Sequence, residues 1–95
     1  MKNKHLKSEV ANLLEIVNKT FGKDSVPYQN LDYCFDILVT VYEYNCDSEK
    51  DLLGKLKDLI NKLSEKIPEL EPQQFQKKYP NIHKMIDYLD KWLSE

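Results

Sequence analysis

The chain has 95 residues, of which 41% are hydrophobic and 32% are charged, and its net charge is −2. These fractions indicate one soluble globular domain with a modest core and exclude an intrinsically disordered chain. All 14 basic residues are Lys, whereas the readout of bases and phosphates depends largely on Arg, so we expect no nucleic-acid binding.

Apolar residues at helical spacing predict a first helix over residues 3–21. The residues of this stripe are Leu6, Val10, Leu13, Leu14, Val17 and Phe21. Gly22 is well placed to end the helix, and the segment GKDSVP that starts there is typical of a loop. A second helix is predicted from Gln29 or Asn30 to Cys46 or Asp47. Because apolar residues cover most of its circumference, we expect it to be the central, most buried helix.

Ser48 and Asp51 have the spacing of a capping box, which predicts the start of a third helix. Its apolar stripe consists of Leu52, Leu53, Leu56, Leu59, Ile60, Leu63 and Ile67. Pro68 is predicted to end this helix, and Pro72 to begin a short one with Phe75 pointing inward. After Pro80, a last helix carries the stripe Ile82, Met85, Ile86, Leu89 and Leu93, flanked by Tyr88 and Trp92.

The predicted fold is therefore all-α, an antiparallel four-helix bundle with a short extra helix before the last helix, in a single domain over residues 1–95. No segment shows the alternation of apolar and polar residues that strands require, and no hairpin dipeptide is present.

The sequence contains neither a signal-peptide pattern nor a run of about 18 apolar residues, so we expect a cytoplasmic protein without a membrane span. The cysteines agree with that compartment. Cys34 and Cys46 are 12 positions apart in one predicted helix, a separation of about 18 Å, which is too long for a disulfide. We expect both to be free thiols in the core.

Motifs of catalysis are missing from the sequence. It has no glycine-rich phosphate loop and no nucleophile elbow, and His5 and His83 have no Cys or His at metal-ligand spacing. We therefore predict a protein that is not an enzyme and that uses neither a cofactor nor a metal ion.

Negative charge is concentrated in the second predicted helix and the turn after it. Residues 28–51 hold six acids and one Lys, a net charge of −5. On a helical wheel the side chains of Asp32, Asp36, Thr40, Glu43 and Asp47 fall within about 80°, with Tyr33 and Tyr44 at the border. We call this surface the acid ribbon. Its predicted partner-binding residues are Asp32, Tyr33, Asp36, Thr40, Glu43, Tyr44, Asp47, Glu49 and Asp51.

Two interpretations of the acid ribbon remain open. It is either the solvated face of a packed helix or a surface that binds a cationic partner. Acids near the C-terminal end of a helix interact unfavourably with the helix dipole. The first interpretation therefore explains the position of Glu43 poorly. Clustered charge and exposed tyrosine are typical of binding surfaces, which favours the second.

The length, acidity, helical content and the acid-and-tyrosine segment LDYCFDILVTVYEY resemble the small helical immunity proteins that bacteria make against their own toxins. The resemblance implies that the acid ribbon covers the basic substrate channel of a toxin domain, with a nuclease favoured. The tyrosine doublet followed by proline of the DNase-colicin immunity family is absent, so that family is not supported. Immunity proteins of peptide bacteriocins, also helical, remain a variant.

A second function from a different class also remains open. The chain is alternatively a non-enzymatic helical subunit or regulator of a larger phage or defence assembly. It would then use the aromatic edge of the last helix, at Tyr88 and Trp92, in place of the acid ribbon. The oligomeric state is open on either interpretation.

Overall fold

The computed structural model describes residues 3–47 and 50–94, and these residues are folded into helices joined by short connections. The elements are α1 (Lys4–Phe21), α2 (Val26–Tyr44), α3 (Lys50–Leu63), the 3₁₀ turn η1 (Pro68–Leu70), α4 (Pro72–Lys78) and α5 (Pro80–Leu93). The described residues contain no strand, which confirms the all-helical class.

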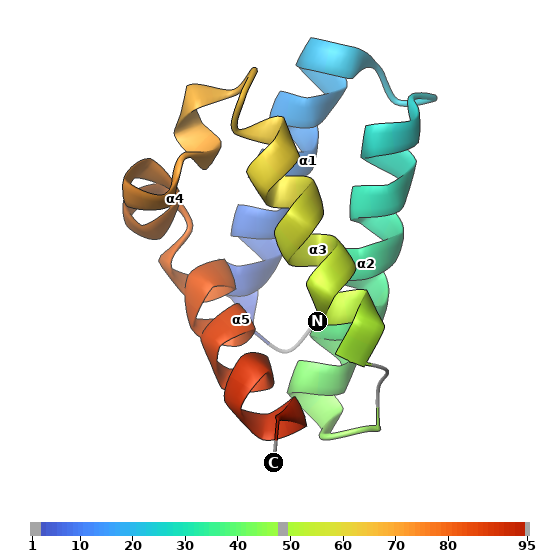
Figure 1. Cartoon of the computed structure of the whole chain (residues 1–95), viewed down its shortest axis with the longest axis vertical. Coiled ribbons are helices and arrows are strands. Elements are labelled where there is room, and N and C mark those ends of the chain that lie inside the picture. Colours follow the sequence, from blue (N-terminus) through green and yellow to red (C-terminus); the bar gives the residue numbers. More distant parts are fainter. Residues whose placement is uncertain (1–2, 48–49, 95) are drawn as a thin grey trace.

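The long helices alternate in direction. Figure 1 shows α1 and α3 running one way and α2 and α5 the other, with α4 at the side of the molecule beside the start of α5. α1 packs against α2 and α5, and α3 packs against the same two helices. α2 also contacts α5, so it touches each of the other long helices and has few directions left toward solvent.

The apolar stripes of the sequence meet in one core. α2 contributes the largest share, with Leu31, Cys34, Phe35, Leu38, Val39 and Val41 all buried. Leu31 and Leu38 have no exposed surface at all. This burial agrees with the prediction that the second helix is the central one, and it leaves only a narrow face of α2 in solvent.

The ends of α1 follow the residues that predicted them. Asn3 is the N-cap, and its side-chain oxygen accepts a hydrogen bond from the backbone N–H of Leu6 at 3.0 Å. Gly22 ends the helix with a φ of 96°, which is strained for residues with a Cβ, and its N–H donates to the carbonyl of Asn18 at 2.8 Å.

The predicted start of the second helix was wrong. α2 begins at Val26, three or four residues earlier, because Ser25 caps it: the Ser25 hydroxyl oxygen accepts from the backbone N–H of Tyr28 at 3.3 Å. Pro27 then lies in the first turn, where its missing N–H costs nothing. At the other end α2 stops at Tyr44, two or three residues before the predicted end, because Asn45 adopts the left-handed conformation.

The predicted end of the third helix was also wrong. α3 stops at Leu63, and a turn over residues 64–66 follows before η1 begins at Pro68. Proline disfavours the helical conformation in the residue before it, and Ile67 is accordingly extended, although its side chain is still buried. The short helix predicted at Pro72 is present as α4, with Phe75 buried. Ser48, the predicted cap of α3, lies outside the described residues.

Tyr79, the residue before α5, places a hydroxyl in the core. Its side chain is 1% exposed, and the hydroxyl has no hydrogen-bond partner among the described residues. Burial raises the pKa of Tyr79 from 10.0 to about 12, and the negative charges of Glu69 and Glu9 add to the rise. The tyrosine therefore keeps its proton in the folded protein at a pH where the unfolded chain loses it.

We expect Tyr79→Phe to leave stability unchanged at neutral pH or to raise it by about 1 kcal/mol, because a buried hydroxyl without a partner is costly. Below pH 10 the ionisation of Tyr79 does not affect the free energy of unfolding, because the hydroxyl is protonated in both the folded and the unfolded wild type. Between pH 10 and about 12 the unfolded wild type releases the proton first, so the wild type loses stability that the variant keeps. Urea unfolding of both proteins across this range measures the difference, and a variant that is less stable at neutral pH would contradict the prediction.

Candidate protein-interaction surface

The acid ribbon forms the exposed face of α2. Asp32, Tyr33, Asp36 and Thr40 are all exposed, and the Tyr33 side chain is 61% exposed. The Thr40 hydroxyl donates to the backbone carbonyl of Asp36 at 2.9 Å, which orients this part of the face. Because most of the other side chains in the middle of the helix are buried or half-buried, these side chains are what that part of α2 presents to solvent.

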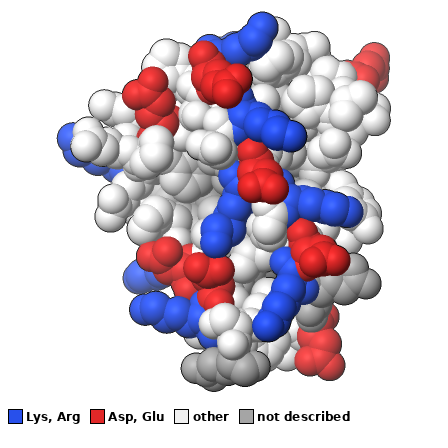
Figure 2. Space-filling model, viewed as in Figure 1, with Lys and Arg blue, Asp and Glu red and all other residues white. Residues whose placement is uncertain are grey.

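The carboxylates of Asp32 and Asp36 lie one turn apart on this face, and neither forms an ion pair within residues 3–47 and 50–94. α2 contains no Lys, so no cation of the same helix can compensate them. Two like charges at this spacing cost a few tenths of a kcal/mol. The face of the molecule over α3 is different, because Figure 2 shows Lys and acidic side chains interleaved there.

Glu43 is placed differently from the other acids of the ribbon. Its side chain is half-buried, and its Oε2 accepts a hydrogen bond from the backbone N–H of Asn3 at 2.9 Å. Asn3 is the N-cap of α1, so Glu43 attaches the start of α1 to α2. This carboxylate therefore supports the fold, and its contribution to partner binding stays a prediction.

The remaining ribbon residues lie around the turn between α2 and α3. Tyr44 is 57% exposed at the end of α2, and Asp47 is exposed just beyond it. Asp51 is exposed in the first turn of α3, where the helix dipole favours an acid. Glu49 lies outside the described residues. The described part of the ribbon thus extends from the middle of α2 to the start of α3.

The aromatic edge predicted on the last helix is only partly accessible. The rings of Tyr88 and Tyr42 meet edge to face with centroids 5.4 Å apart, and the Tyr88 hydroxyl donates to Oδ1 of Asn45 at 3.4 Å. Tyr88 remains 43% exposed, whereas Trp92 packs partly buried against the core. The edge therefore offers one accessible ring, and Trp92 acts mainly in packing.

A buried carboxylate that the sequence analysis missed joins the first and last helices. Glu9 on α1 is 9% exposed, and its Oε1 accepts hydrogen bonds from the backbone N–H groups of Asn81 and Ile82 at 2.9 and 3.0 Å. Its Oε2 accepts from the side-chain amide of Asn81. Tyr79, the N-cap residue of α5, supplies no side-chain cap, so Glu9 takes that role from another helix.

The sequence did contain a signal for Glu9. It lies at helical spacing between Leu6 and Leu13, inside the apolar stripe of α1, where an acid needs a buried partner. The segment YPNI begins the last predicted helix, and the residue before its proline is a tyrosine and not one of the usual N-cap residues Ser, Thr, Asp or Asn. Together the two features indicate a cap from outside the helix.

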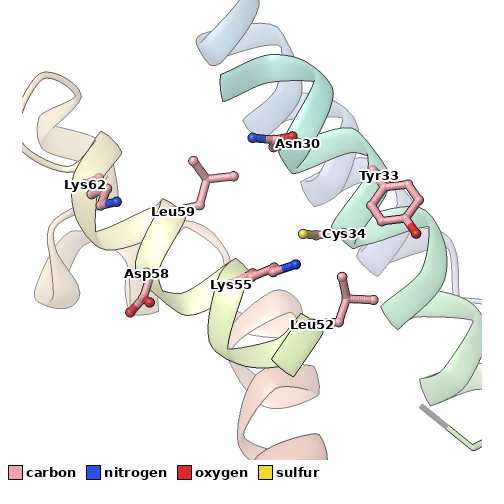
Figure 3. Close-up of a pocket in the computed structure, with 8 residues that line it drawn as sticks. All are labelled: Asn30, Tyr33, Cys34, Leu52, Lys55, Asp58, Leu59 and Lys62. Atoms are coloured by element: carbon pink, nitrogen blue, oxygen red, sulfur yellow. The ribbon is translucent and has the colours of Figure 1, made fainter. Parts of the chain in front are cut away.

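A cleft opens between α2 and α3 beside the acid ribbon, with a volume of about 390 Å³. Figure 3 shows the side chains that line it: Asn30, Tyr33, Cys34, Leu52, Lys55, Asp58, Leu59 and Lys62. Tyr33 belongs to both surfaces. Burial raises the pKa of the Cys34 thiol, and the positive charge of Lys55 lowers it in part. The ammonium group of Lys55 is therefore close enough to act on the inside of the cleft.

The two cysteines have different surroundings. Both are free, but only Cys34 is buried, whereas Cys46 is exposed beyond the end of α2. The prediction of two core thiols is wrong for Cys46, because α2 ends two residues before it.

Metal-ligating side chains do not converge in the described part of the chain: no group of three or more His, Cys, Asp or Glu could hold an ion there. Within the same residues, no helix combines the length and the apolar character that crossing a bilayer requires. Comparison of the chain with protein-family models, with curated proteins and with solved structures found no match.

Proposed function

We propose that this protein is a cytoplasmic immunity protein that binds a cationic toxin domain, in the first place a nuclease, and blocks it. One observation carries the proposal: α2 is buried on most sides, and its exposed face presents Asp32, Tyr33 and Asp36 without any Lys on the same helix. Carboxylates that form no ion pair within the described residues, beside an exposed tyrosine, suit the capture of a basic protein surface.

The mechanism is occlusion. Asp32 and Asp36 pair with Lys or Arg side chains of the toxin that otherwise hold nucleic-acid phosphate, and Tyr33 supplies apolar contact area beside them. The immunity protein needs no cofactor, metal ion or catalytic residue for this. Its negative ribbon accelerates encounter with a basic partner, and rapid capture is what protection from a lethal enzyme demands.

The proposal takes α1, α2, α3 and α5 as the antiparallel four-helix bundle that the sequence predicts, with α4 as the short extra helix. In such a bundle α2 contacts three other helices, and its exposed face is therefore held rigid. Rigid presentation lowers the entropy cost of binding, since few side chains and no backbone segment need to be ordered.

The second candidate is a non-enzymatic subunit or regulator of a larger phage or defence assembly. The partial exposure of Tyr88, stacked edge-on against Tyr42, favours a contact at the C-terminal end of α2 and along α5. This candidate differs from the first in the face that it uses, so one set of variants separates the two.

We expect the double variant Asp32→Asn and Asp36→Asn to weaken partner binding by about tenfold or more, because the basic groups of the partner lose their counter-charges. Binding should also become less sensitive to salt, since the steering field is smaller. The folded protein should be as stable as the wild type or slightly more so, because the repulsion between the two carboxylates is removed. The partner is first captured from the native host and identified by mass, and its affinity is then measured for each variant over a range of salt concentrations.

A matched control removes the same charge elsewhere. Glu15 and Glu65 are exposed outside the ribbon, and the variant Glu15→Gln with Glu65→Gln should keep the wild-type affinity. If both double variants lose affinity equally, general charge and not the ribbon drives binding. If neither loses affinity but Tyr88→Ala does, the aromatic edge is the contact and the second candidate replaces the first.

A further inference from the structure

The cleft between α2 and α3 combines an apolar interior with hydrogen-bond donors. Cys34 is buried at its base, and Leu52 and Leu59 on α3 are only partly covered by the core. In Figure 3 both leucines point toward α2, and Asn30 points from α2 toward α3. A ligand in the cleft would therefore meet apolar groups on one side and the Asn30 amide on the other.

The charge of the cleft is positive where it faces inward. Lys55 and Lys62 both line it, and neither forms an ion pair in the part of the chain that the structure describes. Figure 3 shows the Lys55 side chain extending toward Cys34, whereas Asp58 points away from α2. The lowering effect of Lys55 on the thiol pKa agrees with this direction. The carboxylate of Asp58 therefore points out of the cleft, whereas the ammonium group of Lys55 points into it.

Two donors face the space between α2 and α3, the Lys55 ammonium and the Asn30 amide, whereas Tyr33 lines the edge with its hydroxyl turned away from both. A carboxylate has about four acceptor positions and matches several donors at once. A cationic ligand is disfavoured by the two lysines, and a fully apolar one would leave the Lys55 ammonium and the Asn30 amide without a ligand acceptor.

We propose that the cleft between α2 and α3 binds a small apolar carboxylate, a molecule in which a carboxylate group is joined to a short hydrocarbon chain or ring. The carboxylate lies at Lys55 and Asn30, and the hydrocarbon part lies on Leu52, Leu59 and the thiol of Cys34. The volume of about 390 Å³ holds one such molecule and is at the lower end of the range for ligand sites.

This site goes beyond the proposed function and does not depend on it. The ligand uses donors of the cleft, whereas the partner uses carboxylates of the ribbon, and only Tyr33 belongs to both surfaces. The double variant of Asp32 and Asp36 should therefore bind the small carboxylate as the wild type does, whatever it does to a protein partner.

The test follows backbone amide signals of the full-length protein by NMR while 4-phenylbutyrate is added. We expect saturable shift changes confined to residues of the cleft, such as Asn30, Cys34 and Leu59. The neutral analogue 4-phenylbutanamide has nearly the same shape and should bind about tenfold more weakly, because it lacks the charge-assisted contact. Inorganic phosphate, which has charge but no apolar part, should produce no saturable shifts there.

Variants locate the charge that matters. Lys55→Gln should weaken 4-phenylbutyrate binding about tenfold, whereas Lys66→Gln, which removes a lysine outside the cleft, should leave it unchanged. All these lysines are exposed, so the variants should fold, and the comparison of carboxylate with amide on the wild type does not require a variant. Equal binding of carboxylate and amide, equal binding of phosphate, unchanged binding by the Lys55 variant, or no saturable shifts would each overturn the proposal.

Discussion

Leu38→Ala is expected to lower the free energy of unfolding by about 2–5 kcal/mol, because it removes buried methyl groups and leaves a cavity that the surroundings fill only partly. Leu38 has no exposed surface and lies in the middle of α2, which contacts α1, α3 and α5. Relaxation into the cavity is limited, since neighbours on several sides must move together. A loss of this size is a large fraction of the roughly 5–15 kcal/mol that stabilises a domain.

Val26→Ala is the matched control for Leu38→Ala. Val26 lies on the same helix and is 70% exposed, so its truncation should change the free energy of unfolding by less than about 0.5 kcal/mol. Urea unfolding followed by circular dichroism measures both variants. Nearly equal losses would show that burial on α2 does not decide the cost, and that the core is not centred on this helix.

Glu9→Ala is expected to cost about 2–4 kcal/mol, because it removes the side chain that caps the start of α5 and leaves buried and part-buried backbone donors without their acceptor. The affected donors are the N–H groups of Asn81 and Ile82 and the side-chain amide of Asn81. Glu9→Gln keeps an acceptor oxygen of the same reach but loses the charge and adds an amide donor to the site. It should cost less, about 1–2 kcal/mol.

The control for Glu9 lies on the same helix. Glu15 is exposed, and Glu15→Ala should change stability by less than about 0.5 kcal/mol. The order of the losses should be Glu9→Ala, then Glu9→Gln, then Glu15→Ala. If Glu9→Gln is as stable as the wild type, the negative charge contributes nothing at the start of α5. If Glu9→Ala is also as stable, water reaches these donors and the cap is dispensable.

Local residues made much of the fold predictable. The first helix was placed well because both of its ends are determined within a few residues, by the Asn3 cap and by the positive φ of Gly22. The start of α2 was missed because the residues around Ser25 and Pro27 suit a loop and a capped first turn equally well, and only packing decides between them. The end of α3 was missed because Ile67 belongs to the apolar stripe yet is extended before Pro68.

Long-range contacts set the limit for the site. The exposed face of α2 follows from helical periodicity, so the positions of Asp32, Tyr33 and Asp36 were predictable. Glu43 was not, because its partner Asn3 is 40 positions away and its half-burial depends on where α1 begins. The cleft was not predictable either, since it is formed by the packing of α3 on α2, and periodicity does not specify how closely two helices approach.

The capping of α5 by Glu9 bears on how the chain folds. Asn81 and Ile82 follow Glu9 by 72 and 73 positions in the sequence, so the first turn of α5 gains its acceptor only after α1 has docked against it. An isolated C-terminal fragment lacks that acceptor, and the beginning of its helix should fray. α1 and α5 thus form one cooperative unit whose contacts join residues far apart in the sequence. Such long-range contacts slow folding relative to bundles with only local contacts. Hydrogen exchange at the amide of Ile82 should therefore report opening of the whole domain and not of α5 alone.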